Sequence, residues 1–342
     1  MAIGPAGGGT EPKRPGGAAR VVVWMPESLA RVALPLLSPL LPSLVITALA
    51  PDDRADAIAA ALAGADYLIC SGVVIGEDVP ARAPNLRLIQ KWGAGIDGID
   101  LVATEQASIA VANVPGGNAT AVAEHVFALL LMLAKRLPLA IESMRQGIWE
   151  QATLLRQGLG EIGGKTLGLV GFGHIGRAIA ERAAAFAMPV LYYKRTRLET
   201  EEEDVLGVAY RPLPQLLAQA DVVCVAAALT TEMIGLFTTE RFQGMKPSSF
   251  FINVSRGAVV NEMDLYHALI HGTIAGAALD VFESEPPTCL PLLQLPNCIA
   301  TPHIAGRTSE AMRFITEQCA RNILRVAGGQ TPEHTVHSED RT

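Results

Sequence analysis

The sequence predicts an α/β protein built from two doubly wound parallel sheets with a cleft between them. Three observations lead to this prediction. Short apolar runs alternate with helical patterns along most of the chain, several of these runs end in glycine or polar residues, and one run feeds the glycine-rich turn Gly171-Phe-Gly-His-Ile-Gly176. Because the chain has 342 residues and half of them are hydrophobic, two domains are expected.

Composition argues against nucleic-acid and membrane partners. The net charge is -7 and no predicted element carries a cluster of Lys and Arg. The longest apolar stretch, Val32 to Ala50, contains Pro35, Pro39 and Pro42, which would interrupt a membrane-spanning helix. The five cysteines are scattered and never in C-x-x-C spacing, which is typical of reduced thiols. We therefore expect a cytoplasmic protein, and we expect no metal site.

In the first half of the chain, four strands and one helical pattern indicate a first parallel sheet. The strands are expected at Val21–Trp24, at Ile69-Cys70, at Leu86–Gln90 and at Ile109–Ala112, and the helix at Arg54–Leu62. Gly93 and Gly95 follow the third of these strands, where their backbone N–H groups could hold a small carboxylate. An ordinary loop explains that stretch equally well.

A long helix that runs to Lys135 connects the two halves, with Asn118 or Thr120 as its N-cap. This helix is apolar almost all round and is expected to be buried. The strands expected beyond it are Thr166–Val170, Pro189–Tyr193, Asp221–Val225, Phe250–Val254, Gly276–Asp280 and Cys298–Ala300. The helices expected there begin at His174 and span Leu213–Gln219, Thr239–Gly244, Glu262–His271 and Ser309–Val326. Parallel order would place all ligand-facing loops at one edge of the sheet.

These elements divide the chain into predicted domains. The first domain comprises residues 20–117 and 305–328, because the last helix follows a loop that can return it to the first sheet. The second domain comprises residues 118–304. Residues 1–19 are expected to form a disordered arm, and residues 329–342 a disordered tail.

The glycine-rich turn lies where a buried strand changes to helical spacing, which is the place for a pyrophosphate. Gly171 would allow the tight turn, Gly173 the close approach of phosphate, and Gly176 the packing of helix on strand. The N–H groups of His174 and Ile175 would face the anion. The alternative is a glycine-rich turn without a ligand.

The strand after the glycine helix should end in an acidic residue if the cofactor is NAD, since that residue would bind the ribose hydroxyls. Here the strand ends Tyr193-Lys-Arg-Thr-Arg197, with no acid. The cations Lys194, Arg195 and Arg197 would suit a 2′-phosphate, so NADP is favoured and NAD remains possible. The alternative is that all three are solvated surface cations.

Three ionisable residues, Arg256, Glu285 and His303, lie at strand ends or in the loops beyond them. Each alone is commonly structural. Together they supply what carbonyl reduction needs, because a hydride that reaches the carbon makes an alkoxide that requires a proton and a nearby cation. The shared edge of the sheet is what favours a catalytic interpretation.

From about Val21 to Val326 the sequence resembles the D-isomer-specific 2-hydroxyacid dehydrogenases. The resemblance depends on motifs that are specific in combination: Gly93-Ala-Gly-Ile-Asp97, Asn113-Val-Pro-Gly116, Val122-Ala-Glu-His125, Gly171-Phe-Gly-His-Ile-Gly176, Met245-Lys-Pro247, Asn253-Val-Ser-Arg-Gly-Ala-Val-Val260, Leu279-Asp-Val-Phe282, Glu285-Pro286 and Thr301-Pro-His303. It implies a flavodoxin-like substrate domain and a Rossmann domain that binds NAD(P).

The resemblance also implies catalytic roles. Arg256 would hold the carboxylate and carbonyl of a small 2-oxoacid, and His303 would donate the proton on reduction and remove it on oxidation. Glu285 would pair with the imidazole and favour its protonated form, which keeps an acid available near neutral pH.

Binding roles follow from the same resemblance. Asp280 would bind the nicotinamide carboxamide, and the N–H groups of Ala94 and Gly95 would bind the substrate carboxylate. The family usually has His-x-Pro-Leu-Thr beside the cofactor, whereas this chain has Ala226-Ala-Ala-Leu-Thr230, so Thr230 keeps its place as a cofactor contact without the proline.

Substrate and partner predictions follow from these matches. Lys194 stands where many members of the family have Asp. Members with a basic cluster at this point are often glyoxylate or hydroxypyruvate reductases. The alternatives are a 3-phosphoglycerate dehydrogenase, disfavoured because no regulatory domain follows the last helix, and a non-catalytic dinucleotide sensor. Formate dehydrogenases carry Gln in place of Glu285, whereas phosphite oxidation is not excluded. A homodimer is expected, formed around the long helix from Ala119 and an arm at Gly147–Trp149.

Overall fold

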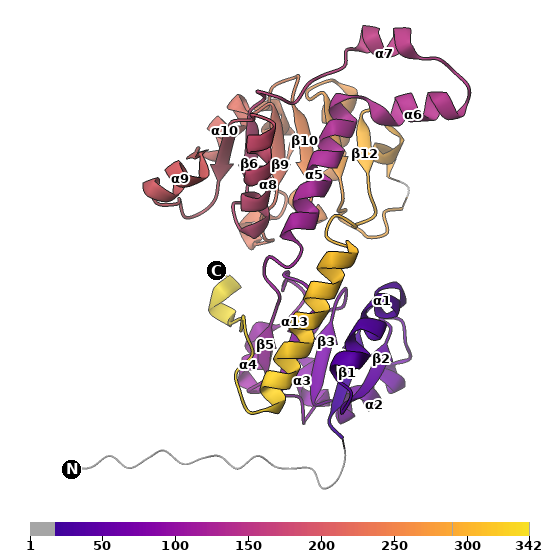
Figure 1. The fold of residues 1–342 in the computed structure, drawn as a ribbon, viewed down its shortest axis with the longest axis vertical. Helices are drawn as coiled ribbons and strands as arrows, with labels where there is room; N and C mark the ends of the chain where they lie inside the picture. The colour runs from indigo at the N-terminus through magenta and orange to yellow at the C-terminus, as the bar shows by residue number, and fades with distance from the viewer. Residues whose placement is uncertain (1–17, 289, 342) are drawn as a thin grey trace, which may run out of the picture. The chain divides into compact units, whose positions relative to one another are not determined.

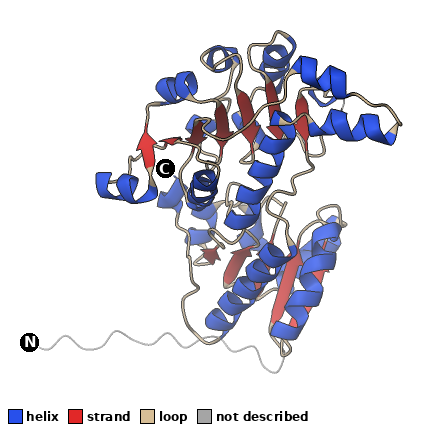
Figure 2. Ribbon diagram, turned by 45° about the horizontal axis from the view of Figure 1, so that its top comes forward, coloured by secondary structure: helices blue, strands red, loops and turns tan. Residues whose placement is uncertain are grey.

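The computed structural model describes residues 18–288 and 290–341, so most of the predicted N-terminal arm, residues 1–19, lies outside the described residues. The chain divides into two compact units. The first contains the described residues up to Lys91, Gly98–Ala112 and Cys319–Val336, and the second contains Trp92–Asp97, Asn113–Gln318 and the described residues from His337. Each unit has a parallel sheet with helices against it, drawn red and blue in Figure 2. The prediction of an α/β protein with two parallel sheets is confirmed.

The sheet of the first unit has five parallel strands in the order β2-β1-β3-β4-β5. Its strands are β1 (Arg20–Trp24), β2 (Val45–Leu49), β3 (Tyr67–Cys70), β4 (Leu88–Lys91) and β5 (Ala110–Ala112). Its helices are α1 (Glu27–Leu37), α2 (Ala55–Gly64), α3 (Asp78–Arg82), α4 (Leu101–Gln106) and the part of α13 (Ser309–Ala327) that begins at Cys319. The fully buried strand β3 pairs with β1 on one side and β4 on the other.

The apolar stretch Val32–Ala50 is divided among α1, the 3-10 turn Ser38–Leu40 and β2. The sequence did not reveal β2, because this strand lies at the edge of the sheet and most of its residues are partly or fully exposed. Within the described part of the chain, no helix combines the length and hydropathy that crossing a lipid bilayer requires.

The C-terminal segment differs from the predicted disordered tail, because backbone and buried side-chain hydrogen bonds hold it in the first unit. Val336 N–H donates to Val111 O at 2.8 Å. The buried Asn322 side chain donates to Glu333 O at 3.0 Å and accepts from Glu333 N–H at 2.8 Å. The polar composition that suggested disorder gave no sign of these partners, which come from distant parts of the sequence.

The sheet of the second unit has seven parallel strands in the order β12-β11-β10-β9-β6-β7-β8. They are β6 (Leu167–Val170), β7 (Val190–Tyr193), β8 (Val208–Tyr210), β9 (Val222–Val225), β10 (Phe250–Asn253), β11 (Gly276–Leu279) and β12 (Cys298–Ala300). The main helices are α5 (Ala119–Ala134), α8 (His174–Ala185), α9 (Thr200–Leu206), α10 (Leu213–Gln219), α11 (Thr239–Gln243) and α12 (Glu262–Ile270). The predicted strands here lie within one or two residues of the observed ones, and only the three-residue edge strand β8 was not expected.

Alternate residues of these strands contribute to two hydrophobic cores on opposite faces of the sheet. In β9, Val222 and Cys224 join α5 and α8 on one face, whereas Val223 and Val225 join α10 and α12 on the other. The long helix α5 is buried along most of its length, as its apolar sequence predicts. Asn118 occupies its N-cap position, but the side chain makes no capping hydrogen bond and lies against Gly306 instead.

An arm formed by α6 (Leu137–Arg145) and α7 (Gln151–Gln157) follows α5 and projects beyond the sheet (Figure 1). Its large apolar side chains are unusually exposed: Trp149 is 73% exposed, Leu155 66% and Met144 57%. An exposed apolar patch of this kind marks a surface that usually contacts another molecule.

Candidate active site

The glycine turn between β6 and α8 has the local geometry that its sequence predicts. Gly171 has φ +97°, and a Cβ there would lie 2.5 Å from the backbone of Ala227. At Gly176 a Cβ would lie 2.7 Å from Gly171 O, so this glycine lets the helix pack against the end of the strand. A Cβ at Gly173 would meet no atom within 4 Å. The fold itself therefore does not require Gly173, and its open space fits a ligand held against the helix N-terminus.

The first turn of α8 offers backbone donors rather than side chains to such a ligand. The first four N–H groups of a helix have no intrahelical partner, and α8 has no side-chain cap. The ring of His174 lies against Gly116, and Ile175 packs against the core of α5 and α8. The backbone N–H groups of these two residues lie in the first turn of the helix, so the predicted residues fit the pyrophosphate of a dinucleotide.

Beyond β7, the three predicted cations have different surroundings. Arg197 donates two hydrogen bonds to the Glu203 carboxylate, from Nε at 2.8 Å and from Nη2 at 2.7 Å. Lys194 and Arg195 have no hydrogen bond or ion pair to any described residue. The assignment of Arg197 to a phosphate thus differs from what its contacts show, because its charge is already compensated.

The predicted cofactor contact Thr230 lies beside this cluster. A hydrogen bond from Thr230 to the exposed carboxyl of Glu232 lowers the pKa of Glu232, and the charge of Arg195 contributes to the same shift. Ala226 and Ala227, which stand where the family has a His-x-Pro sequence, approach Gly171 closely through their backbone atoms.

His303 and Glu285 form an ion pair, with Nδ1 of His303 2.7 Å from Oε2 of Glu285. The backbone N–H of Phe282 donates to Oε1 of Glu285 at 3.1 Å. Burial alone would raise the pKa of the Glu285 carboxyl, but the hydrogen bond and charge of His303, the Phe282 N–H and the charge of Arg256 together lower it. Because Nδ1 faces the carboxylate, Nε2 is the ring nitrogen that remains to meet a substrate.

Asp280 holds the segment that carries His303. Its carboxylate, 1% exposed at the end of β11, accepts from Thr301 Oγ1 at 2.6 Å, Ile304 N–H at 2.9 Å and Ala305 N–H at 2.9 Å. Within this segment His303 has φ +52°, a left-handed conformation that is unfavourable for a residue with a Cβ. The sequence assigned Asp280 only to the cofactor and missed this structural contact.

Two further residues support the same segment and were not singled out from the sequence. Nε2 of His125 lies 3.0 Å from Thr301 Oγ1, and Nε of Arg307 donates to His303 O at 2.7 Å. His125 lies in one of the family motifs, which was the available signal; Arg307 lies in none of them.

Arg256 follows β10 and lies across the turn at residues 93–97. It donates from Nε and Nη2 to Asp97, at 3.3 and 3.0 Å, and from Nη1 to Ser255 O at 2.8 Å. A side chain at Gly95 would collide with Nη2 of Arg256. A guanidinium has five N–H donors, so two remain after these contacts with described residues. Gly95 is therefore needed both for the turn and for the position of the arginine.

The turn at residues 93–97 also presents backbone donors. Asn113 Nδ2 donates to Ala94 O at 2.7 Å, and Val114 N–H donates to Gly93 O at 2.9 Å. The N–H groups of Ala94 and Gly95 have no acceptor among the described residues. All the predicted substrate-binding and catalytic residues belong to one compact unit, and the charge of Arg256 acts on Glu285.

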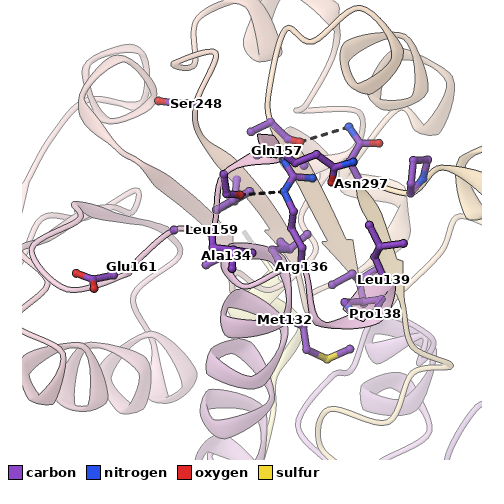
Figure 3. A pocket seen from close by; sticks show the side chains of 18 of the residues that line it. Met132, Ala134, Arg136, Pro138, Leu139, Gln157, Leu159, Glu161, Ser248 and Asn297 are labelled. Atoms are coloured by element: carbon purple, nitrogen blue, oxygen red, sulfur yellow. Dashed lines mark hydrogen bonds between the residues drawn. The ribbon is translucent and has the colours of Figure 1, made fainter. Parts of the chain in front are cut away.

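A cavity of about 490 Å³ lies elsewhere in the same unit, at the root of the arm (Figure 3). In the wall of this cavity, the Arg136 side chain donates to Gly158 O at 3.1 Å and to Gln157 O at 3.3 Å. Apolar side chains such as Met132 and Leu139 line much of it. Among the described residues that line this cavity there is none of the predicted site residues.

Comparisons with known proteins bear on this site. Residues 127–305 match the family model described as the NAD binding domain of D-isomer specific 2-hydroxyacid dehydrogenases. A glyoxylate reductase of Pyrococcus furiosus is 40% identical over 269 residues, which is 78% of this chain and 80% of that one. A D-3-phosphoglycerate dehydrogenase of Archaeoglobus fulgidus is 38% identical over 79% of this chain and 51% of its own length.

Among solved structures, D-lactate dehydrogenase of Aquifex aeolicus complexed with NAD and lactic acid resembles this chain with a TM-score of 0.81. It is 29% identical, and the match covers 90% of this chain and 96% of that one. The fold of this chain is thus similar to that of this D-lactate dehydrogenase.

Substitutions of two glycines in the turn are expected to have different effects. Gly173→Ala should leave the free energy of unfolding within about 1 kcal/mol of the parent and weaken dinucleotide binding about tenfold, because its methyl group would fill space kept open for the pyrophosphate. Gly176→Ala should instead destabilise the fold by about 1–3 kcal/mol, since its methyl group meets Gly171 O. Urea unfolding and cofactor fluorescence titration measure the two effects. Tight binding by Gly173→Ala would contradict the assignment.

Proposed function

Because the chain belongs to the D-isomer specific 2-hydroxyacid dehydrogenase family, we propose that it works mainly as a reductase of small 2-oxoacids, with glyoxylate or hydroxypyruvate as substrate. The observation that carries the proposal is the His303–Glu285 pair in the same unit as Arg256 and the open donors of Ala94 and Gly95. The glyoxylate reductase of Pyrococcus furiosus supports the choice of substrate.

A nicotinamide held at this site would supply the hydride that C2 of the oxoacid takes up on reduction and would accept it on oxidation. The two remaining donors of Arg256 polarise the carbonyl and hold the carboxylate, together with the N–H groups of Ala94 and Gly95. Nε2 of the His303 imidazolium gives its proton to the carbonyl oxygen, which becomes a hydroxyl. Glu285 remains ionised and holds the imidazole in place before and after the transfer.

We propose NADPH as the preferred cofactor and NADH as the less favoured one. Lys194 and Arg195 support this choice, since they follow β7 at the position where an acidic residue would bind the ribose of NAD. Neither forms an ion pair within 4.0 Å with a described residue, and the carboxyl that Arg195 acts on, that of Glu232, is exposed. Arg197 is not part of this argument, because it is paired with Glu203.

3-Phosphoglycerate oxidation is the second candidate function. The 38% identity with the enzyme of Archaeoglobus fulgidus favours it, although the chain spans about half the length of that relative. A panel of 2-oxoacids and 3-phosphohydroxypyruvate, assayed with NADH and NADPH, separates the two candidates by the ratio of kcat/KM values.

A cytoplasmic location is also part of the proposal. The four described cysteines, Cys70, Cys224, Cys298 and Cys319, are all free. Burial raises the pKa of the Cys70 thiol to about 11 and that of Cys224 to about 12, so both are poor nucleophiles.

We further propose a homodimer in which the α6–α7 arm packs against a second copy of the chain. The exposure of Trp149, Leu155 and Met144 and the apolar lining of the cavity at the arm's root support this partner, because matching apolar surfaces of two copies would bury each other.

The first prediction concerns the catalytic side chains. His303→Ala and Arg256→Ala should each lower kcat/KM for glyoxylate reduction by at least about a thousandfold without changing the melting temperature by more than a few degrees. The side chain of Arg256 is 33% exposed and that of His303 39%, so their loss opens no buried cavity. Arg321→Ala, on the exposed side of α13, serves as the control. Reduction at the parent rate by either variant would refute the mechanism.

The second prediction concerns pH. The lowered pKa of Glu285 means that the carboxylate is ionised above about pH 4.5, and that its contribution to stability is lost only as pH falls through the lowered value. Glu285→Gln removes the charge that pairs with His303 Nδ1, so the variant should be less stable than the parent at neutral pH and should reduce glyoxylate more slowly. The stability difference between parent and variant, measured by urea unfolding, should shrink as pH falls below about 4.5 through the lowered pKa of Glu285. A stability difference that stays the same down to about pH 3 would count against the pairing.

The third prediction concerns assembly. Trp149→Glu combined with Leu155→Glu should convert a dimer into a monomer in light scattering, because charges would replace apolar surface at the contact. Val102→Glu, at an apolar position of α4 that is also more than half exposed, should leave the mass unchanged. A parent protein of monomer mass at micromolar concentration would show that the arm does not dimerise.

A further inference from the structure

Glu203 is a buried carboxylate next to the loop that carries the predicted phosphate-binding cations. It lies on α9, and its side chain is 7% exposed. A buried carboxylate requires compensation by donors or positive charge. The partners of Glu203 therefore show which neighbouring groups already have a hydrogen-bond or charge partner within the protein.

The donors to Glu203 lie on both sides of the loop at residues 194–198, one on strand β7 before it and one near its end. Arg197 donates through Nε and Nη2 in a bidentate pair, and the Tyr192 hydroxyl donates to Oε1 at 2.6 Å. The Tyr192 oxygen in turn accepts from Leu198 N–H at 2.9 Å. The Arg197 guanidinium also lies over the ring of Tyr210, 5.6 Å from its centroid. The last strand residues and the end of the loop are thus tied to one carboxylate.

Within this network the Glu203–Arg197 pair is ionised and the Tyr192 hydroxyl is protonated at all physiological pH values. Hydrogen bonds from Arg197 and then Tyr192 lower the pKa of Glu203 to about 2, and burial, followed by the Glu203 contact, raises the pKa of Tyr192 to about 12. The stabilisation from Glu203 is therefore complete above about pH 4.5 and is lost only as pH falls toward 2.

The neighbouring cations separate into two groups. Arg177 on α8 pairs with Glu202 at 2.7 Å, and Arg197 pairs with Glu203, so α9 neutralises both. Lys194 and Arg195, at the start of the loop, form no ion pair within 4.0 Å with a described residue, although the charge of Arg195 acts on the exposed carboxyl of Glu232. A bidentate, ring-stacked arginine is a poor candidate for a ligand contact, because breaking its pair would leave a buried charge uncompensated.

We propose that Glu203 is a specificity-determining positioning residue: through Arg197 and Tyr192 it fixes the 194–198 loop so that Lys194 and Arg195, and not Arg197, bind the 2′-phosphate of NADPH. This rests on the proposed function in two respects, since the glycine turn must hold a dinucleotide and that dinucleotide must be NADPH. Arg197 acts as a support for the loop, and its charge is not available to the phosphate.

Two roles for Arg197, a support for the loop or a phosphate ligand, predict opposite changes in NADPH affinity when the Glu203 charge is removed. If Arg197 were a phosphate ligand restrained by Glu203, then removing the Glu203 charge would free a cation and strengthen NADPH binding. If Glu203 positions the loop, the same change disorders Lys194 and Arg195 and weakens NADPH binding. Loss of a preorganised side chain costs a few-fold in affinity.

The experiment measures the dissociation constants of NADPH and NADH by fluorescence titration for the parent and its variants. Glu203→Gln removes the charge and keeps the size of the side chain. Arg197→Lys keeps the positive charge and loses the two-pronged contact, and because that side chain is more than half exposed it also serves if Glu203→Gln fails to fold. Glu201→Gln, which removes the same charge from an exposed position of α9, is the matched control.

We expect Glu203→Gln to weaken NADPH about fivefold relative to NADH and Arg197→Lys about threefold. The double variant should be no worse than Glu203→Gln alone, since both act through one contact. Lys194→Ala should weaken NADPH about tenfold, and Glu201→Gln should change neither cofactor by more than about twofold.

Three results would overturn the proposal. They are stronger NADPH binding by Glu203→Gln, an unchanged ratio of the NADPH and NADH dissociation constants in both single variants, and additive losses of NADPH affinity in the double variant. The titration does not involve turnover. A parent protein that binds dinucleotide but reduces no 2-oxoacid would therefore refute the proposed reaction and leave this test intact.

Discussion

The carboxylate of Asp280 is the interaction on which the candidate active site depends. It is almost completely buried and satisfies two backbone N–H groups and one hydroxyl from the short segment 301–305. Breaking a buried carboxylate's hydrogen bonds costs several kcal/mol in a protein interior. This carboxylate therefore determines where the backbone of His303 lies, and Glu285 then determines how its ring is turned. The imidazole is positioned by two carboxylates with separate tasks.

The parallel sheet explains how residues so far apart in sequence reach one place. The strands β6, β7, β10, β11 and β12 all run in the same direction, so the segments after them share one edge. Close backbone contacts then bring these segments together. Gly257, immediately after Arg256, lies so close to the backbone of Phe282 and Glu283 that no side chain would fit. Glycine at this position lets the loop that carries Arg256 pack against the loop that carries Glu285.

Much of the fold and the site could be predicted because the signals are local. The boundary between β6 and α8 is encoded in adjacent residues, and so are the roles of Gly171 and Gly176. The partner of Arg197 could not be predicted, because Glu203 is one of three consecutive glutamates and only packing against Tyr192 selects it. Edge strands β2 and β8 lack a buried pattern, and the C-terminal segment is fixed by Asn322, whose partners come from tertiary structure. The domain boundaries and the residue roles remain predictions.

The left-handed backbone of His303 has a consequence for engineering this protein. A residue with a Cβ in this conformation costs roughly 1 kcal/mol that glycine would not. A search for stabilising substitutions would therefore select glycine at a position whose side chain the proposed reaction needs. The backbone conformation of His303 lowers stability while its side chain serves the proposed reaction. Substitutions that raise the free energy of unfolding are therefore better sought far from the 301–305 segment, where they do not affect activity.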